Sequence, residues 1–338
     1  MTETLPPIYF YIPKNQWPVG DLPEIPQEYG QWMSFWNSRY GRGKYDWTLQ
    51  TYLHLKSDGL PCKLIDFIPD RGILISHRDF LPNNLQPLPK LLVICIKADR
   101  EPHPWAQLHV VQNHLDELLQ RQPALWQSYA LRFWVQPKLI PRDLARGSRF
   151  ENAAFFGVAG TLAPQLQSLE WEEKLAVLGL RWETVECDRW QDYSEVDVAV
   201  AVRSFDGNNT FDSKPASKLI NAWHAGIPAI LGRESAYRNE RKSELDYIEV
   251  TSIDEAMAAL FRLKSDRTLR LAMVENGKIR AREINNACTI LQWRNFLTVT
   301  AYPAYYRWCG TSQEQQQLFL KRRYLSFQFH QVRSIFLK

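Results

Sequence analysis

Apolar residues recur along the chain in short runs that end at polar or glycine-containing turns. Such runs are typical of β-strands, and they occupy residues 8–12, 63–68, 72–76, 91–96, 109–113, 153–157, 196–202, 228–231 and 247–250. The run 91–96 is apolar at every position, which indicates a strand that helices cover on both faces. The segments between most runs are long enough for crossover helices. The alternation therefore predicts an α/β fold with mostly parallel sheets.

Helical periodicity fills several of the intervening segments. Helices are expected at 47–57, around Trp171, at 254–263 and at 266–284. The strand pattern pauses at residues 137–148, which are charged and contain two prolines, and then restarts. We interpret this segment as a linker between two Rossmann-like domains that face each other across a cleft. The predicted bounds are 1–145 and 146–305, followed at 306–338 by a helical tail that packs across both domains.

Composition agrees with this division. At about 150 residues per domain, 338 residues suit two domains, and 45% hydrophobic with 23% charged residues is ordinary for globular proteins. A net charge of +4 is too small to indicate a nucleic-acid partner. The five cysteines form no C-x-x-C pair and are read as reduced. No signal peptide and no run of about 18 apolar residues is present, so we expect a cytoplasmic protein.

The tail has its own charge pattern. Residues 307–338 contain six basic residues and one acid, with aromatic residues among them. One interpretation is a basic amphipathic surface for anionic lipid, that is, a peripheral contact with a membrane. The other is a terminal helix that packs on the domains and keeps its basic face in water.

Several common enzyme signatures are missing from the sequence. It has no G-x-x-x-x-G-K-[ST], no G-x-G-x-x-G after a strand, no H-E-x-x-H and no G-x-S-x-G. No D-x-D pair is present either, so nothing marks a metal-bridged diphosphate site. These absences argue against P-loop enzymes, nicotinamide dehydrogenases, zinc hydrolases and serine hydrolases, and we expect no metal and no bound cofactor.

One segment carries most of the chemical signal. After the run 196–202 comes a polar loop and then an amphipathic stretch that predicts a helix. Ser213 can cap this helix, Pro215 suits its first turn, and Gly226 followed by Pro228 ends it. In open α/β sheets, ligands bind at the carboxyl ends of strands, which is where this helix would begin.

The polar face of this helix is positively charged. Lys214, Lys218 and Asn221 fall at i, i+4 and i+7, and Arg203 follows the preceding strand. A helix start already presents unpaired N–H groups, so two added ammonium groups would make a site for a diphosphate. The alternative is a solvated lysine face on a surface helix.

The segment also resembles a known signature. Residues 215–228 read P-x-x-K-L-x-N-A-x-x-A-G-x-P, which is similar to the donor-site motif in the C-terminal domain of GT-B glycosyltransferases. The resemblance implies a metal-independent hexosyl or related transferase that moves a sugar from a nucleoside-diphosphate sugar to a small-molecule, glycan or lipid acceptor. Asn221 stands where the family usually has glutamate. The resemblance implies that the donor is bound by Arg203, Lys214, Ser217, Lys218 and Asn221, together with Gly157 and, after strand 228–231, with Arg233, Ser235 and Tyr237.

Candidate bases for the acceptor hydroxyl follow two strands of the first domain. They are His77, Asp79, Asp99 and His103.

Two rival functions stay open. One is a non-catalytic nucleotide-sugar-binding or interaction protein on a transferase fold, for which Asn221 is the best argument. The other is a different Rossmann enzyme such as an epimerase, which the missing glycine fingerprint disfavours.

Overall fold

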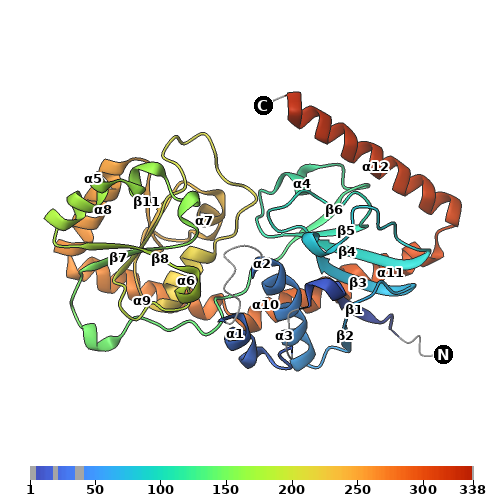
Figure 1. Ribbon diagram of the computed structural model, residues 1–338, viewed down its shortest axis with the longest axis horizontal. Helices are drawn as coiled ribbons and strands as arrows, with labels where there is room; N and C mark the ends of the chain where they lie inside the picture. The colour runs from blue at the N-terminus through green and yellow to red at the C-terminus, as the bar shows by residue number, and fades with distance from the viewer. Residues whose placement is uncertain (1–4, 18–21, 35–41, 337–338) are drawn as a thin grey trace. The chain divides into compact units, whose positions relative to one another are not determined.

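The structure is a computed structural model that describes residues 5–17, 22–34 and 42–336. The chain forms two compact units (Figure 1). Of the described residues, the first unit contains 5–17, 22–32, 42–132 and 289–336, and the second contains 33–34 and 133–288. The chain therefore leaves the first unit after Arg132 and returns to it at Thr289.

Six parallel strands form the sheet of the first unit, in the order β2-β1-β3-β4-β5-β6. They are β1 (Ile8–Tyr11), β2 (Cys62–Ile65), β3 (Arg71–His77), β4 (Lys90–Ile96), β5 (Leu108–Val111) and β6 (Gln127–Ala130). Strands β3 and β4 pair from Arg71 opposite Lys90 to His77 opposite Ile96. From Leu91 onward β4 is buried, as its continuous apolar run predicts.

Helices from both ends of the chain accompany this sheet. They are α1 (Pro26–Ser34), α2 (Arg42–Tyr45), α3 (Thr51–Ser57), α4 (Glu117–Gln120), α10 (Asn286–Asn295), α11 (Tyr302–Gly310) and α12 (Gln313–Phe336), with π-helical turns η2 (Asp46–Gln50) and η8 (Phe296–Ala301). The C-terminal helices are tied to the sheet's loops: the Trp308 indole N–H donates to the Leu88 carbonyl at 3.0 Å.

The second unit is a five-stranded parallel sheet in the order β11-β10-β9-β7-β8. Its strands are β7 (Asn152–Phe156), β8 (Arg181–Val185), β9 (Val198–Ala201), β10 (Ala229–Gly232) and β11 (Ile248–Val250). Its helices are α5 (Leu169–Val177), α6 (Ser217–Ala225), α7 (Ser235–Glu240), α8 (Ile253–Ser265) and α9 (Arg267–Glu283). Strands β7, β9 and β10 are central and their apolar side chains form one buried core with α5, α6 and α8.

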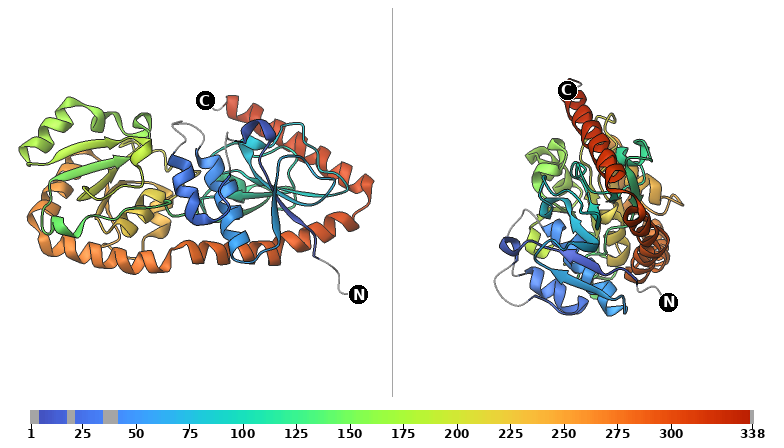
Figure 2. Two further views of the ribbon diagram at one scale, coloured as in Figure 1. Left: turned by 60° about the horizontal axis from the view of Figure 1, so that its bottom comes forward. Right: turned by 90° about the vertical axis from the view of Figure 1, so that its right-hand side faces the viewer.

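The predicted fold class is confirmed. Two separate parallel sheets with helices and a long C-terminal helical extension are present, as Figures 1 and 2 show. The unit bounds differ from the predicted 145/146 and 305/306. Residues 137–148, predicted to be a linker, instead pack within the second unit. Ile140 forms a β-bridge with Asp192, and the Arg142 N–H donates to the Ala225 carbonyl.

Helix α12 packs through one face on the first sheet. Its Arg323 is fully buried, where it stacks over the Trp126 ring at 4.3 Å and donates to the Gln107 carbonyl at 3.2 Å. The Trp126 indole N–H in turn donates to the Ser326 hydroxyl at 3.2 Å. The expectation of a basic face left in water is thus wrong for Arg323. Within the described stretches of the chain, no helix has the length and apolarity needed to cross a bilayer.

Candidate functional site

The carboxyl ends of three neighbouring strands gather polar residues in the second unit. Gly157 follows β7, Arg203 follows β9 and Glu234 follows β10, and these strands are adjacent in the order β10-β9-β7. Helix α6 begins at Ser217, at the end of the loop that leaves β9. Parallel strands end at one edge of a sheet, so the loops and the helix start share that edge.

A buried carboxylate lies among positive charges at this edge. Glu234 is 1% exposed, and the Arg203 Nε donates to its Oε2 at 3.1 Å. Its other oxygen, Oε1, is buried and has no hydrogen-bond partner within the described part of the chain. Burial raises the pKa of Glu234, while Arg203, Lys218 and Lys214 oppose the shift. We call Arg203, Lys214 and Lys218, the three cations that act on Glu234, the cation cluster.

Lys218 is the most perturbed member of the cation cluster. Its ammonium lies 5.3 Å from the centroid of the Phe155 ring. Burial, reinforced by Arg203 and Lys214 and opposed by Glu234, lowers the pKa of Lys218 to about 7. Among the residues that the structure describes, none accepts a hydrogen bond from it. An anion at this edge would therefore both pair with Lys218 and favour its protonated form.

A glycine is required where Lys218 approaches the sheet. A Cβ at Gly157 would lie 2.6 Å from Phe155 Cζ and 3.3 Å from Lys218 Cε. A side chain at 157 would therefore displace the ring over which the Lys218 ammonium sits. The predicted site residue Gly157 and the cation cluster are in the same place.

Helix α6 begins later than the sequence predicted. Ser213 lies in a turn before the helix and Pro215 follows that turn, and the residue at the N-cap, Ala216, has no side-chain hydrogen bond to the helix. The turn is closed by the Lys214 N–H, which donates to the Phe211 carbonyl at 2.9 Å, with Phe211 at φ 54°. The predicted helical face that joins Lys214 to Lys218 is thus wrong. The two ammonium groups are nonetheless close enough for Lys214 to lower the pKa of Lys218.

Asn221 has structural partners. It is 8% exposed, and its Oδ1 accepts a hydrogen bond from the Gln136 backbone N–H at 3.2 Å. Its side chain also bonds the Tyr193 hydroxyl, whose ring stacks on Phe156 at 3.8 Å between centroids. The amide thus joins α6 to the segment that enters the second unit.

The loop after β10 differs from its predicted role. Arg233 is exposed, whereas Ser235 is 4% and Tyr237 1% exposed. The Tyr237 ring meets Tyr247 edge-on in the core, so only Arg233 of the three has an open side chain. Glu234 is the residue that sequence reasoning missed. The sequence places this acid two residues after a buried strand, but its pairing with Arg203 is visible only in the folded structure.

The first unit brings three of the candidate bases together. His77 ends β3 and is 3% exposed, and its Nδ1 accepts from the Asp79 N–H at 3.1 Å. The Arg100 guanidinium bonds both carboxylate oxygens of Asp79 and lies 3.8 Å from Asp99. Burial, opposed by Asp79, lowers the pKa of His77 to about 4. His77 is therefore neutral at physiological pH.

The fourth candidate, His103, is fully engaged elsewhere. It is 0% exposed; its Nδ1 accepts from the N–H groups of Trp105 and Ala106, and its Nε2 lies 2.9 Å from the Pro82 carbonyl. Both nitrogens have partners, so His103 has no lone pair left for an acceptor. Across the described ranges, no three His, Cys, Asp or Glu side chains lie where they could share a metal ion.

Comparison with known proteins gives similarity in structure only. No family model and no curated protein matches the sequence. HepE of Anabaena, solved with UDP, has a TM-score of 0.49 at 10% identity over 87% of this chain and 100% of its own. Sucrose-phosphate synthase of Thermosynechococcus elongatus has 0.47 at 13% over 69% and 74%. The pneumococcal O-GlcNAc transferase GtfA, solved with UDP and GlcNAc, has 0.44 at 10% over 74% and 59%. The likeness to these structures concerns the arrangement of strands and helices alone.

Proposed function

We propose that the protein is a nucleotide-sugar-dependent glycosyltransferase whose donor diphosphate binds at the cation cluster. The observation that carries this proposal is the surplus of positive charge around Glu234 at the carboxyl ends of β7, β9 and β10. Arg203 is partly neutralised by Glu234, whereas Lys218 has no acceptor within the described residues. The start of α6 adds backbone N–H groups without a side-chain cap.

The same groups would assist bond cleavage. As the glycosidic bond of the donor breaks, negative charge grows on the departing nucleoside diphosphate, and fixed cations stabilise that charge in the transition state. The buried Oε1 of Glu234 is available to accept a hydrogen bond from a donor hydroxyl. This would be the task that the family resemblance gives to position 221, where the amide is occupied by Gln136 and Tyr193.

For the acceptor we retain His77, Asp79 and Asp99 as candidate bases. A neutral imidazole can take a proton from a hydroxyl, and His77 is neutral at pH 7 because its pKa is lowered to about 4. The same low pKa makes it a weak base, so the nearby carboxylate of Asp79, 3.9 Å from its Nδ1, is the alternative. His103 is left out because both of its nitrogens are bonded.

We further propose a cytoplasmic protein that meets a membrane through α12. None of the five cysteines, which all lie among the described residues, forms a disulfide bond, as expected in a reducing compartment. The outer face of α12 exposes Leu318 (49%), Leu325 (65%), Phe329 (66%) and Val332 (52%). At 100° per residue these four lie on one stripe, with Lys321 and Arg322 exposed beside it. Basic residues flanking an apolar stripe suit an anionic lipid surface, where a lipid acceptor would be found.

The test is a thermal-unfolding panel of UDP, GDP, ADP, CDP and their sugar conjugates. A ligand at about 100 times its Kd should stabilise the protein by about 2.7 kcal/mol. Donors that stabilise are then incubated with the protein, and release of nucleoside diphosphate is measured with and without candidate acceptors. No stabilisation by any diphosphate would refute the site. Stabilisation without release or transfer would favour the non-catalytic binding protein instead.

A further inference from the structure

The second unit contains a cavity at the opposite end of its strands from the cation cluster. Its volume is about 420 Å³, within the range of small-molecule sites. Its walls come from the residues before β7 and β10, from Asp197 before β9, and from the first three turns of α9. The last residues of α6, Ala225 and Gly226, also line it. Lys218 belongs to the first turn of that helix, so the two sites lie at its two ends.

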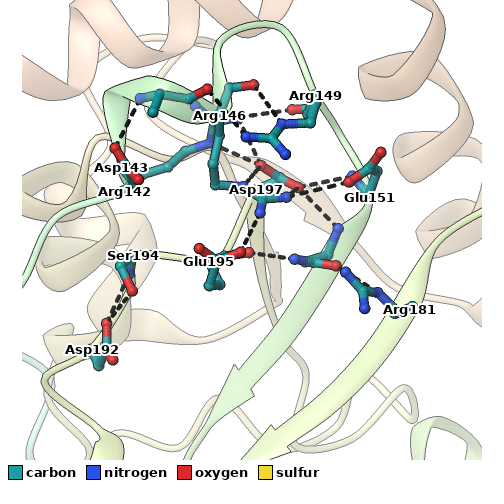
Figure 3. Close-up of polar contacts among 12 residues, drawn as sticks. Arg142, Asp143, Arg146, Arg149, Glu151, Arg181, Asp192, Ser194, Glu195 and Asp197 are labelled. Carbon is teal, nitrogen blue, oxygen red and sulfur yellow. Dashed lines mark hydrogen bonds and ion pairs between the residues drawn. The ribbon is translucent and has the colours of Figure 1, made fainter.

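Asp197, in the wall of this cavity, is hydrogen-bonded to several segments of the chain. Figure 3 shows its carboxylate surrounded by hydrogen-bond donors. Arg142 Nε and Arg146 Nη2 each donate to it at 2.8 Å, and the backbone N–H groups of Glu151 and Asn152 donate at 2.8 and 3.0 Å. The hydrogen bonds of the ionised form, opposed by burial, lower the pKa of Asp197. The negative charge of Asp197 is therefore balanced by Arg142 and Arg146 and does not attract a cationic ligand to the cavity.

The remaining charge around the cavity is positive. Arg142, Arg149, Arg267, Arg270 and Lys278 line it, against Asp197 and Glu275. Glu275 pairs with Lys278 at 2.6 Å. Burial lowers the pKa of Arg270, and the positive charges of Arg267 and Arg142 lower it further. Arg270 thus lies close to the positive charges of Arg267 and Arg142, whose effect on its pKa Asp197 and Asp266 oppose.

The guanidinium groups of Arg270 and Arg142 donate hydrogen bonds to backbone carbonyls, whereas that of Arg267 donates none within the described residues. Arg270 Nη2 donates to the Ser148 carbonyl at 3.2 Å and its guanidinium stacks over the Phe150 ring at 5.0 Å. Arg142 Nη2 donates to the Arg149 carbonyl at 2.8 Å. Arg267, exposed at the start of α9, has no hydrogen bond or ion pair with any residue that the structure describes.

Apolar groups complete the lining. Phe150 and Trp223 are buried beside the cavity, while Leu271 is 53% exposed at its rim. A ligand here would meet both charged and apolar surface. A guanidinium group can donate two parallel hydrogen bonds to the oxygens of one phosphate. The apolar part of such a ligand would pack on Phe150, Trp223 and Leu271.

We propose that this cavity is a second ligand site, which takes a small organic phosphate with an apolar or aromatic body. The site does not depend on the donor site: it uses other residues, at the other end of the strands. A bound phosphate would offset the positive charges that Arg267 and Arg142 place near Arg270. Arg267 supplies an exposed guanidinium, and Arg142 and Arg270 supply two that hydrogen bonds to the protein hold in place.

Calorimetric titration with phenyl phosphate tests the proposal. Inorganic phosphate is titrated separately to represent the anionic part of the ligand, and phenol to represent its aromatic part. Phenyl phosphate should bind the full-length protein at constant salt more tightly than either probe. Arg267→Ala should weaken it about tenfold, the effect of losing one charge-assisted contact. Arg267→Glu should abolish measurable binding, although an acid in the first turn of α9 favours the helix.

Two control variants separate this site from others. Arg282→Ala removes an exposed arginine from the last turn of the same helix and should leave binding unchanged. Lys218→Met removes a charge from the cation cluster and should also leave it unchanged. The proposal is overturned if phenyl phosphate does not bind, if inorganic phosphate binds equally well, if both Arg267 variants bind like the wild type, or if Lys218→Met abolishes binding.

Discussion

Replacing Lys218 by methionine tests the donor site with little damage to the fold. Methionine keeps an unbranched apolar chain to lie against Phe155 beside Gly157, where the Lys218 stem now passes. It removes only the ammonium, which has no hydrogen-bond acceptor within the described residues. Because Lys218 is partly buried at some cost to its charged form, the variant should be as stable as the wild type or more so.

The expected loss concerns binding of nucleoside diphosphate. A hydrogen bond to a charged group contributes about 1.5–3 kcal/mol, which is roughly a 10- to 150-fold rise in Kd. A pH dependence follows as well. The pKa of Lys218 is lowered to about 7 in the free protein, and a bound diphosphate would raise it. The complex then holds more protons than the free protein, so affinity should fall as pH rises above 7.

The assay is calorimetric titration of the best diphosphate from the panel, at pH 7.0, 8.0 and 9.0 and constant salt. Above pH 7 a terminal phosphate is largely ionised, so the protein dominates the slope. For the wild type, Kd should rise by up to about tenfold per pH unit, and the slope should flatten in Lys218→Met. The control is Lys174→Ala, at a partly exposed lysine on α5 that pairs with Glu170. A variant that binds within twofold of the wild type, or keeps its pH slope, would refute the assignment.

Three further outcomes are expected. Asn221→Ala should lower the free energy of unfolding in urea by about 1–3 kcal/mol, because the Gln136 N–H loses its acceptor, while donor affinity changes less than twofold. Asp197→Asn should cost about 3–5 kcal/mol at pH 7, since Arg142 and Arg146 lose a buried counter-ion. As its pKa is lowered on folding, the difference from wild type should shrink as pH falls below about 4. Sugar transfer should persist in EDTA because the cation cluster carries the charge of the leaving group; activity that is lost on chelation and restored by magnesium would contradict this.

The sequence predicted the central strands of both sheets and the edge strands β2 and β11, but not the edge strands β6 and β8. β4 was found because both of its faces are covered, which makes the run 91–96 apolar throughout. β6 and β8 lie at the edges of their sheets, at 127–130 and 181–185, where polar and charged side chains alternate with apolar ones. Edge strands need no continuous apolar run, so a search for such runs passes over them. The return of the chain to the first unit at Thr289 depends on packing between distant segments, which periodicity does not record.

The limits of sequence reasoning at the site have the same cause. Arg203 and Lys218 could be predicted because their positions follow from one strand end and one helix, both local features of the chain. The role of Glu234 could not, because its partner Arg203 lies in the loop of a neighbouring strand. Asn221 was assigned to a ligand because its spacing places it on the face that carries Lys218. Its actual partner is a backbone N–H from residue 136. A polar residue on a helix face can serve a ligand or a distant loop equally well, and only the folded arrangement distinguishes the two.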